Sequence, residues 1–259
     1  MDLATQLQSA LRTQSLPLPS LPWLRTLVTT RTPPPPLASL IATARTRILA
    51  SDLTTTNLLD PTYADSHAFP PNTTTATAAA TPSTQQQQQL SHDVVVQILD
   101  LENLNRSRWE QVEELEAIDR GEQTRGRHII RLPTENSESQ DDGGDAAATQ
   151  TQAGAATQAA RESEKQTKNA THKLVLQDCK GQKVYAIELK RLERIAVGKT
   201  NIGEKVLLKR GMTIARGVLL LEPANCLVLG GKVEAWHKVW AEGRLARLRG
   251  EVGADRDGR

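Results

Sequence analysis

Apolar residues recur at helical spacing over the first fifty positions of the chain. Leu3, Leu7, Ala10 and Leu11 lie three or four residues apart, and Leu37 to Leu49 repeats the pattern more strongly. Between them, Ser20 is placed to cap a helix that has Pro22 in its first turn and an apolar face from Trp23 to Val28. Three short helices sharing a small core are therefore predicted. Leu3, Trp23 and Ile41 could instead form a binding surface, but core packing is the simpler interpretation.

A different pattern marks the carboxyl-terminal part of the chain, where short continuous or alternating apolar runs predict strands. Gly217–Val233 holds two such runs separated by Pro223-Ala-Asn and ended by Gly230-Gly231, which is typical of the last strands of a compact β domain. An amphipathic segment with Val233, Trp236 and Trp240 at helical spacing follows, and it predicts a closing helix to about Arg249. Earlier strands are predicted at Asp93–Leu99, His172–Gln177, Lys183–Leu189 and Lys205–Arg210.

These elements predict an α+β chain in which a small three-helix bundle precedes a five-stranded oligonucleotide/oligosaccharide-binding (OB) barrel with a carboxyl-terminal helix. Two segments, Thr73–Leu90 and Thr134–Ala170, are rich in small and polar residues and lack the apolar surface that folding needs. The expected organisation is a helical domain at 1–60, a low-complexity linker at 61–91, the barrel domain at 92–249 and a frayed tail at 250–259. A long, disordered insertion at 100–170 would separate the first two strands.

The start of that insertion carries apolar residues among charged ones, without an obvious core for them to join. They are Leu101, Leu104, Trp109, Val112, Leu115 and Ile118. One interpretation is that this arm is buried in a partner protein; the other is that it covers its own barrel. The presence of Trp109 slightly favours burial in a partner protein, because tryptophan is a typical interface anchor.

The net charge of +2 conceals two regions of opposite sign. Residues 100–145 carry thirteen acidic and six Lys or Arg residues, whereas residues 172–216 carry eleven Lys or Arg and four acidic residues. Lys205, Lys209 and Arg210 are candidates for binding either a partner or nucleic-acid phosphates. Tyr185 is the only aromatic residue in the proposed strands. Because single-strand binding relies on aromatic stacking, this scarcity favours a protein partner over nucleic acid.

Candidate chemistry is sparse. The sequence has no nucleophile elbow, phosphate-binding glycine loop or metal motif, and its five histidines are scattered, mostly beside stretches expected to be exposed. Cys179 and Cys226 stand apart, as free thiols in a reducing compartment would. We therefore predict a protein that is not an enzyme and has no cofactor or metal site. With no apolar run of membrane-spanning length, it is expected to be soluble and intracellular.

Four blocks follow one another in the carboxyl-terminal part of the chain: Lys205–Gly211 (KVLLKRG), Arg216–Asn225 (RGVLLLEPAN), Val228–Glu234 (VLGGKVE) and Leu245–Leu248 (LARL). In their order and spacing, these blocks resemble the OB domain of the RecQ-mediated genome instability protein 1 family. The amino-terminal helices, with Pro19–Leu24 reading PSLPWL, resemble the family more loosely. The resemblance covers residues 1–60 and 92–249.

This resemblance implies a nuclear, non-enzymatic subunit that binds a type IA topoisomerase, topoisomerase III, and works with a RecQ helicase to dissolve double Holliday junctions. In the family, the insertion between the first two strands reaches into the topoisomerase gate, and the arm at 100–132 occupies that place here. Longer members carry a second OB domain that pairs with another OB subunit. Since the sequence ends after one barrel, that subunit is not among the partners we expect.

Overall fold

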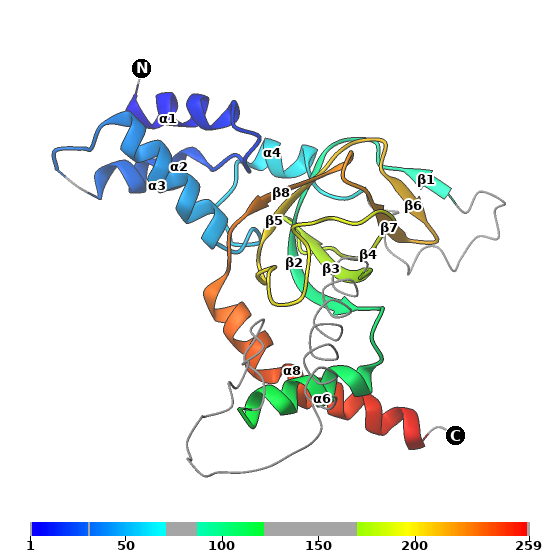
Figure 1. Cartoon of the computed structure of the whole chain (residues 1–259). Helices are drawn as coiled ribbons and strands as arrows, with labels where there is room; N and C mark the ends of the chain where they lie inside the picture. Colours follow the sequence, from blue (N-terminus) through cyan, green and yellow to red (C-terminus); the bar gives the residue numbers. More distant parts are fainter. Residues whose placement is uncertain (1, 31, 71–86, 122–169, 258–259) are drawn as a thin grey trace, which may run out of the picture. The chain divides into compact units, whose positions relative to one another are not determined.

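The computed structural model describes residues 2–30, 32–70, 87–121 and 170–257 (Figure 1). These residues fall into two compact units. The first comprises Met1–Leu104 with Thr171–Arg244, and the second comprises Asn105–Ala170 with Leu245–Arg259. The predicted segments at 73–86 and 134–169 lie outside the described residues.

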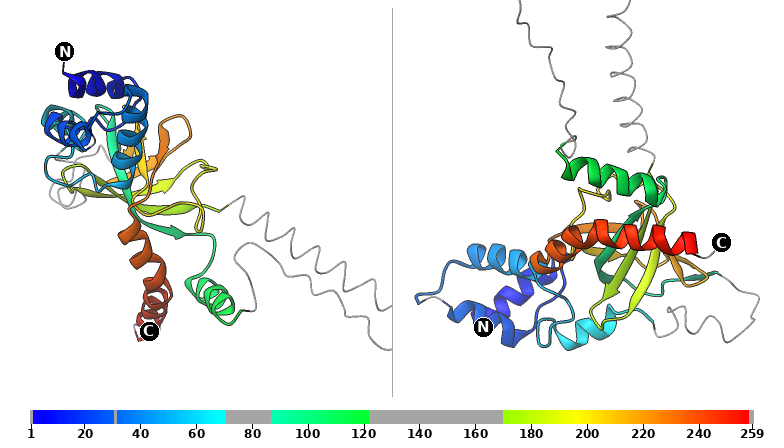
Figure 2. Two further views of the ribbon diagram at one scale, coloured as in Figure 1. Left: turned by 90° about the vertical axis from the view of Figure 1, so that its left-hand side faces the viewer. Right: turned by 90° about the horizontal axis from the view of Figure 1, so that it is seen from below.

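The first unit begins with the predicted helices, α1 (Leu3–Arg12), α2 (Leu21–Thr29) and α3 (Leu37–Ala50). The predicted cap at Ser20 is confirmed, because its Oγ accepts a hydrogen bond from the Trp23 backbone N–H at 3.3 Å. The helices bury a common core that consists of Ala4, Leu7, Leu11, Leu16, Leu24, Leu27, Leu40, Ala44 and Ile48. The three helices lie against one another (Figure 2). Trp23 and Ile41 are half-buried against their common core, which agrees with the core interpretation.

The segment expected to be a linker contributes to the fold. Pro61–Ser66 forms a short helix, α4, capped by Asp60, and Phe69 lies in the core of the sheet. The backbone N–H of Phe69 donates to Asp178 Oδ2 at 2.9 Å. The expectation of a linker from residue 61 is therefore corrected: its first ten residues include one helical turn and an aromatic side chain that the core needs.

The sheet has eight strands in the order β1-β6-β7-β4-β3-β2-β5-β8, in place of the five expected (Figure 1). The strands are β1 (Gln87–Gln89), β2 (Val94–Asn103), β3 (His172–Asp178), β4 (Lys183–Glu188), β5 (Lys205–Leu208), β6 (Thr213–Ala215), β7 (Val218–Leu221) and β8 (Cys226–Gly230). The count rises because the short strands β1 and β6 extend one side. In addition, the two predicted runs of Gly217–Val233 form separate strands, β7, which is parallel to β4, and β8, which is antiparallel to β5. The α+β class is confirmed.

One face of the curled sheet forms the main core, which includes Val96, Leu174, Val184, Val206 and Leu219. The opposite face is covered over β2 and β5, where Val95 and Leu207 pack with Leu53, Leu58 and Leu59 from the segment after α3. This explains why β2 and β5 are buried on both faces, whereas β3 and β4 alternate between buried and more exposed positions.

Gly231 marks a close approach between the helical segment and the end of β8. Its φ of +100° favours glycine, and a Cβ at this position would overlap the backbone carbonyl of Leu49 in α3. After this glycine, α8 (Glu234–Asp257) begins, and it extends beyond the expected end near Arg249. Trp240 is buried in the sheet core, with Trp236 packed beside it, and Trp240 Nε1 donates to Asp100 Oδ1 at 2.6 Å.

The close approach at Gly231 predicts that Gly231→Ala is destabilising. Backbone strain at positive φ adds to the overlap with Leu49, so we expect the free energy of unfolding to fall by about 2 kcal/mol or more. Gly243→Ala is the matched control, since no atom lies within 4 Å of its Cβ position on α8. That variant is expected to gain about 0.5–1 kcal/mol. Urea denaturation measures both; equal stabilities for the two variants would contradict the prediction.

Candidate functional site

The two ends of the insertion are joined by the antiparallel ladder between β2 and β3. Its register runs from Val96 opposite Asp178 to Asn103 opposite His172, with an irregularity between Ile98 and Asp100. One residue further out, the Leu104 backbone N–H donates to the Thr171 carbonyl at 2.9 Å. The sixty-six residues from 105 to 170 therefore leave and re-enter the sheet at one point.

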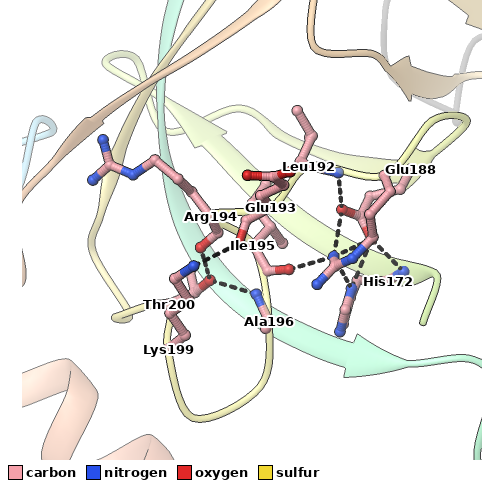
Figure 3. A network of polar contacts seen from close by, with 10 residues as sticks. His172, Glu188, Leu192, Glu193, Arg194, Ile195, Ala196, Lys199 and Thr200 are labelled. Atoms are coloured by element: carbon pink, nitrogen blue, oxygen red, sulfur yellow. Dashed lines mark hydrogen bonds and ion pairs between the residues drawn. The ribbon is translucent and has the colours of Figure 1, made fainter. Parts of the chain in front are cut away.

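A buried polar network fixes the end of the insertion that re-enters the sheet (Figure 3). Glu188, at the end of β4, accepts hydrogen bonds from the His172 backbone N–H at 2.8 Å and from Arg191 Nη1 at 3.0 Å. Its Oε2 also lies 2.6 Å from His172 Nδ1. His172 and Glu188 are 1% and 5% exposed, so the carboxylate has little water around it and depends on these donors. The expectation of an exposed, uninvolved histidine is corrected at His172.

The same carboxylate holds the loop that follows β4. Glu188 Oε1 accepts from the Leu192 backbone N–H at 3.0 Å, and Arg191 Nη1 also donates to the Ile195 carbonyl. Further along, the Thr200 hydroxyl accepts from the Ala196 N–H at 3.0 Å and donates to the Arg194 carbonyl at 3.2 Å (Figure 3). Glu188 thus links the end of the insertion to the start of the loop over 189–200, and Arg191 and Thr200 hold the rest of that loop.

In the second unit, the insertion begins with helix α6 (Arg108–Asp119). A complete capping box starts it: Ser107 Oγ accepts from the Glu110 N–H at 3.1 Å, and Glu110 Oε2 accepts from the Ser107 N–H at 2.8 Å. Two ion pairs join α6 to the end of α8, namely Arg249 Nη2 with Glu116 Oε1 at 2.7 Å and Arg108 Nε with Glu251 Oε2 at 2.9 Å. The start of the insertion is therefore an ordered, mainly acidic helix.

The structure divides the six predicted arm residues into two groups. Leu101 is 3% exposed within the sheet core and Val112 is 3% exposed on α6, so burial gives both a packing role in place of the partner contact expected. Leu104 and Trp109 are 46% and 49% exposed, while Leu115 and Ile118 are half-buried on α6. Trp109 Nε1 donates to Glu113 Oε1 at 3.0 Å, one turn further along the helix. Trp109, Leu115 and Ile118 stay predictions as partner contacts, as does Leu104 on the first unit.

The three predicted basic residues also divide. Lys205 is 0% exposed, and its Nζ donates to the Gly203 carbonyl at 2.6 Å beneath the covered face of β5. Burial lowers the pKa of Lys205 to about 8, although the charge of Asp52 raises it in part. Lys205 is therefore a buried structural residue, which corrects its assignment to a partner- or DNA-binding surface. Lys209 and Arg210 are exposed in the turn after β5.

A second buried polar cluster, which no sequence pattern predicts, joins the segment after α3 to the sheet. Gln97, 0% exposed on β2, accepts from the Leu53 N–H at 3.0 Å and donates to Asp52 Oδ1 at 2.7 Å. Burial alone would raise the pKa of Asp52, but the hydrogen bonds from Gln97 and Thr54 and the charge of Lys205 lower it below its usual value. The cluster positions the segment that covers β2 and β5.

Within the described residues, the structure contains no group of three or more His, Cys, Asp or Glu that could hold a metal ion. No described helix is both long and apolar enough to cross a membrane. In the first unit, the β2–β3 ladder and the Glu188 network hold both ends of the insertion. In the second unit, α6 carries the 49% exposed side chain of Trp109.

Comparisons with known proteins agree with this architecture. A family model described as "RMI1, N-terminal OB-fold domain" matches residues 70–244, and one described as "RMI1, N-terminal helical domain" matches residues 11–56. The RecQ-mediated genome instability protein 1 of Schizosaccharomyces pombe (strain 972 / ATCC 24843) is 30% identical over 164 residues, which are 63% of this chain and 66% of that protein. The chain's match thus spans just under two thirds of its relative. The predicted OB fold and family resemblance are confirmed.

The Glu188 network predicts a large effect of Glu188→Ala on stability. The substitution removes the acceptor of the buried His172 N–H and Leu192 N–H and one acceptor of the Arg191 guanidinium, so we expect a loss of about 3 kcal/mol in the free energy of unfolding. Glu193→Ala, at an exposed position of the same loop, is expected to change it by about 0.5 kcal/mol or less. Chemical denaturation of both variants tests this; a Glu188→Ala protein as stable as the Glu193→Ala protein would refute the anchoring role.

The lowered pKa of the buried Lys205 predicts that stability rises with pH above about 8. The folded state releases the Lys205 proton near pH 8, whereas the ordinary value is 10.5. Between these values the unfolded chain binds more protons, so raising the pH favours folding. Relative to Lys205→Met, which cannot titrate, the native protein should gain about 1.4 kcal/mol of unfolding free energy per pH unit in this window. Denaturation of both proteins at several pH values from 7 to 10 measures this; a constant difference would show that the buried amine does not titrate there.

Proposed function

The chain belongs to the RMI1 family, and on this premise we propose that it is a non-catalytic subunit that binds a type IA topoisomerase, topoisomerase III, through its OB domain and insertion. Family membership gives a role in genome stability together with RecQ complexes. The proposal adds the topoisomerase as the direct partner and α6 with the rest of the insertion as the part that engages its gate.

The observation that carries this proposal is the rigid mount of the insertion. The β2–β3 ladder, the Leu104–Thr171 hydrogen bond and the Glu188 network hold both of its ends in the sheet. A segment tied down at both ends loses less conformational entropy on binding than a free tail of the same length. Trp109, half-exposed on a capped helix, supplies the large apolar side chain that typically anchors an interface.

The mechanism follows from a difference between the affinities of the insertion for the open and the closed topoisomerase gate. A type IA topoisomerase cuts one strand, opens a gate, passes another strand and reseals the cut. An insertion that binds the open gate more tightly than the closed gate shifts the equilibrium toward the open state by the ratio of the two affinities. Resealing is delayed, and decatenation is favoured over simple relaxation. With a RecQ helicase driving strand separation in the nucleus, this activity dissolves double Holliday junctions without crossovers.

Binding of single-stranded nucleic acid through phosphate contacts is the second candidate function. The structure leaves fewer of the predicted basic residues exposed for it. With Lys205 buried, exposed Lys209 and Arg210 remain at one turn, and Tyr185 is 48% exposed on β4. Phosphate contacts by exposed lysines and arginines alone give a salt-sensitive affinity, and Tyr185, the only aromatic residue of the predicted strands, offers a single stacking position. A direct protein partner therefore accounts for more of the described surface.

Replacement of residues 105–170 by Asn-Gly tests the proposal. Because the Leu104 N–H already meets the Thr171 carbonyl, a two-residue turn should close the β2–β3 hairpin without disturbing the first unit. We expect its barrel to fold while topoisomerase binding and stimulated decatenation are lost. Trp109→Ala in the full chain should weaken binding about tenfold or more. The control is Val239→Ala, at a 70% exposed position of α8 outside the insertion.

Pull-down with the cognate topoisomerase and a decatenation assay give the readout. Full binding and full stimulation by the Asn-Gly variant would remove the insertion from the mechanism. Equal losses for Trp109→Ala and Val239→Ala would show that the assay reports general surface changes and not the α6 anchor.

A further inference from the structure

The connection between α2 and α3 contains four consecutive prolines, Pro33–Pro36 (Figure 1). The pyrrolidine ring fixes φ of each proline at about −65°, and a following proline confines ψ of the residue before it to the extended range. Pro36, the last of the four, has φ −55° and ψ 148°, which are torsions of a polyproline II helix. The sequence therefore holds this connection in the conformation that proline-recognising domains bind.

The exposure of the four prolines follows the three-residue period of a polyproline II helix. Pro33 and Pro36 are three residues apart and so share one side of such a helix, and both are exposed. Pro34 is exposed as well, whereas Pro35 is half-buried and marks the side turned toward the protein. We refer to Pro33, Pro34 and Pro36 as the proline face.

Pro36 stands where helix stability favours a capping residue. It is the N-cap of α3, and its ring offers no side-chain acceptor to the first turn. The chain begins α2 and α4 differently: Ser20 and Asp60 accept hydrogen bonds from the first turn, and the proline comes one or two residues later. The start of α3 therefore lacks a stabilising cap, so the four prolines are not explained by helix initiation alone.

Both ends of the connection are anchored in the helical core. Leu27 of α2 and Leu40 of α3 are buried there. A segment that is already held in its bound conformation loses little conformational entropy when a partner binds it. The prolines have no backbone N–H groups, and their carbonyl oxygens are hydrogen-bond acceptors. An aromatic-lined groove with hydrogen-bond donors between its rings matches both properties.

The helical region that carries the proline face is basic. Residues 1–50 include five arginines and one acidic residue, Asp2, which is ion-paired with Arg25. Arg45 and Arg47 are exposed on α3. Acidic side chains around the groove of a partner would complement this charge. Independently of the proposed function, we infer that the proline face binds a partner domain that recognises polyproline II segments through an aromatic-lined groove bordered by acidic residues.

The test is titration calorimetry of the full chain with a panel of purified SH3, WW and EVH1 domains from the same organism. We expect at least one of these domains to bind the native chain. The double variant Pro33→Ala, Pro34→Ala regains two N–H groups and a freer backbone, so it should bind that domain about tenfold or more weakly. Pro22→Ala is the matched control, because Pro22 is a single exposed proline in the first turn of α2, and its effect should stay below about twofold.

Pro36→Ser separates binding from stability. The serine hydroxyl supplies the N-cap that α3 lacks, which offsets the freedom that the unfolded chain regains when the proline is lost. We expect the urea midpoint of this variant to stay close to the native value, while binding of the domain weakens about tenfold or more. A parallel loss of stability and binding would show that the prolines only hold the helices in place, and it would overturn the inference.

Three other results would also overturn the inference. The first is that no domain of the panel binds the native chain. The second is that the double variant binds as tightly as the Pro22→Ala control. The third is that the folded double variant loses affinity for the cognate topoisomerase and for no domain of the panel, which would assign the proline face to the topoisomerase interface.

Discussion

The antiparallel ladder between β2 and β3 is the interaction on which the structure depends. It brings together residues that the insertion separates by more than sixty positions, and it supplies the central strands of the sheet core. Closing a loop of this length has an entropic cost that grows only slowly with its length, so a well-packed ladder can support a long insertion. The Glu188 network adds polar contacts at the point where the chain re-enters the sheet. The two strands at the base of the insertion are therefore held together by contacts within the first unit.

The outward side of the sheet is covered over some strands and uncovered over others. Over β2 and β5 it is covered by the segment after α3. The polar side chains of Gln97, Asp52 and Lys205 in this region are satisfied by one another, by backbone groups or by Thr54. Over β3, β4 and β7 the side chains stay apolar but uncovered among the described residues. The outward apolar side chains over β2 and β5 therefore attach the segment after α3 to the sheet.

Features with a local cause could be predicted from the sequence. The three amino-terminal helices and the main strands follow from the periodicity of apolar residues, and the Ser20 cap follows from the residue types that begin a helix. Which of the six arm residues are buried and which are exposed could not be predicted. The burial of Leu101, for example, depends on β2 continuing past a bulge to Asn103. Lys205 and His172 were assigned to the surface because charged and titratable side chains usually lie there. Their burial depends on Asp52 and Glu188, partners that lie far away in the sequence and that only the fold brings near.

Amide hydrogen exchange on the chain, alone and with its cognate topoisomerase, tests the central claim most directly. The ladder amides of Val96–Asn103 and His172–Asp178 should exchange slowly in both samples, while those of α6 should become protected only in the complex. That result would show a fixed mount presenting a partner-binding insertion. Ladder amides that exchange as fast as those of α6 in the free chain, or an α6 that gains no protection in the complex, would contradict the account.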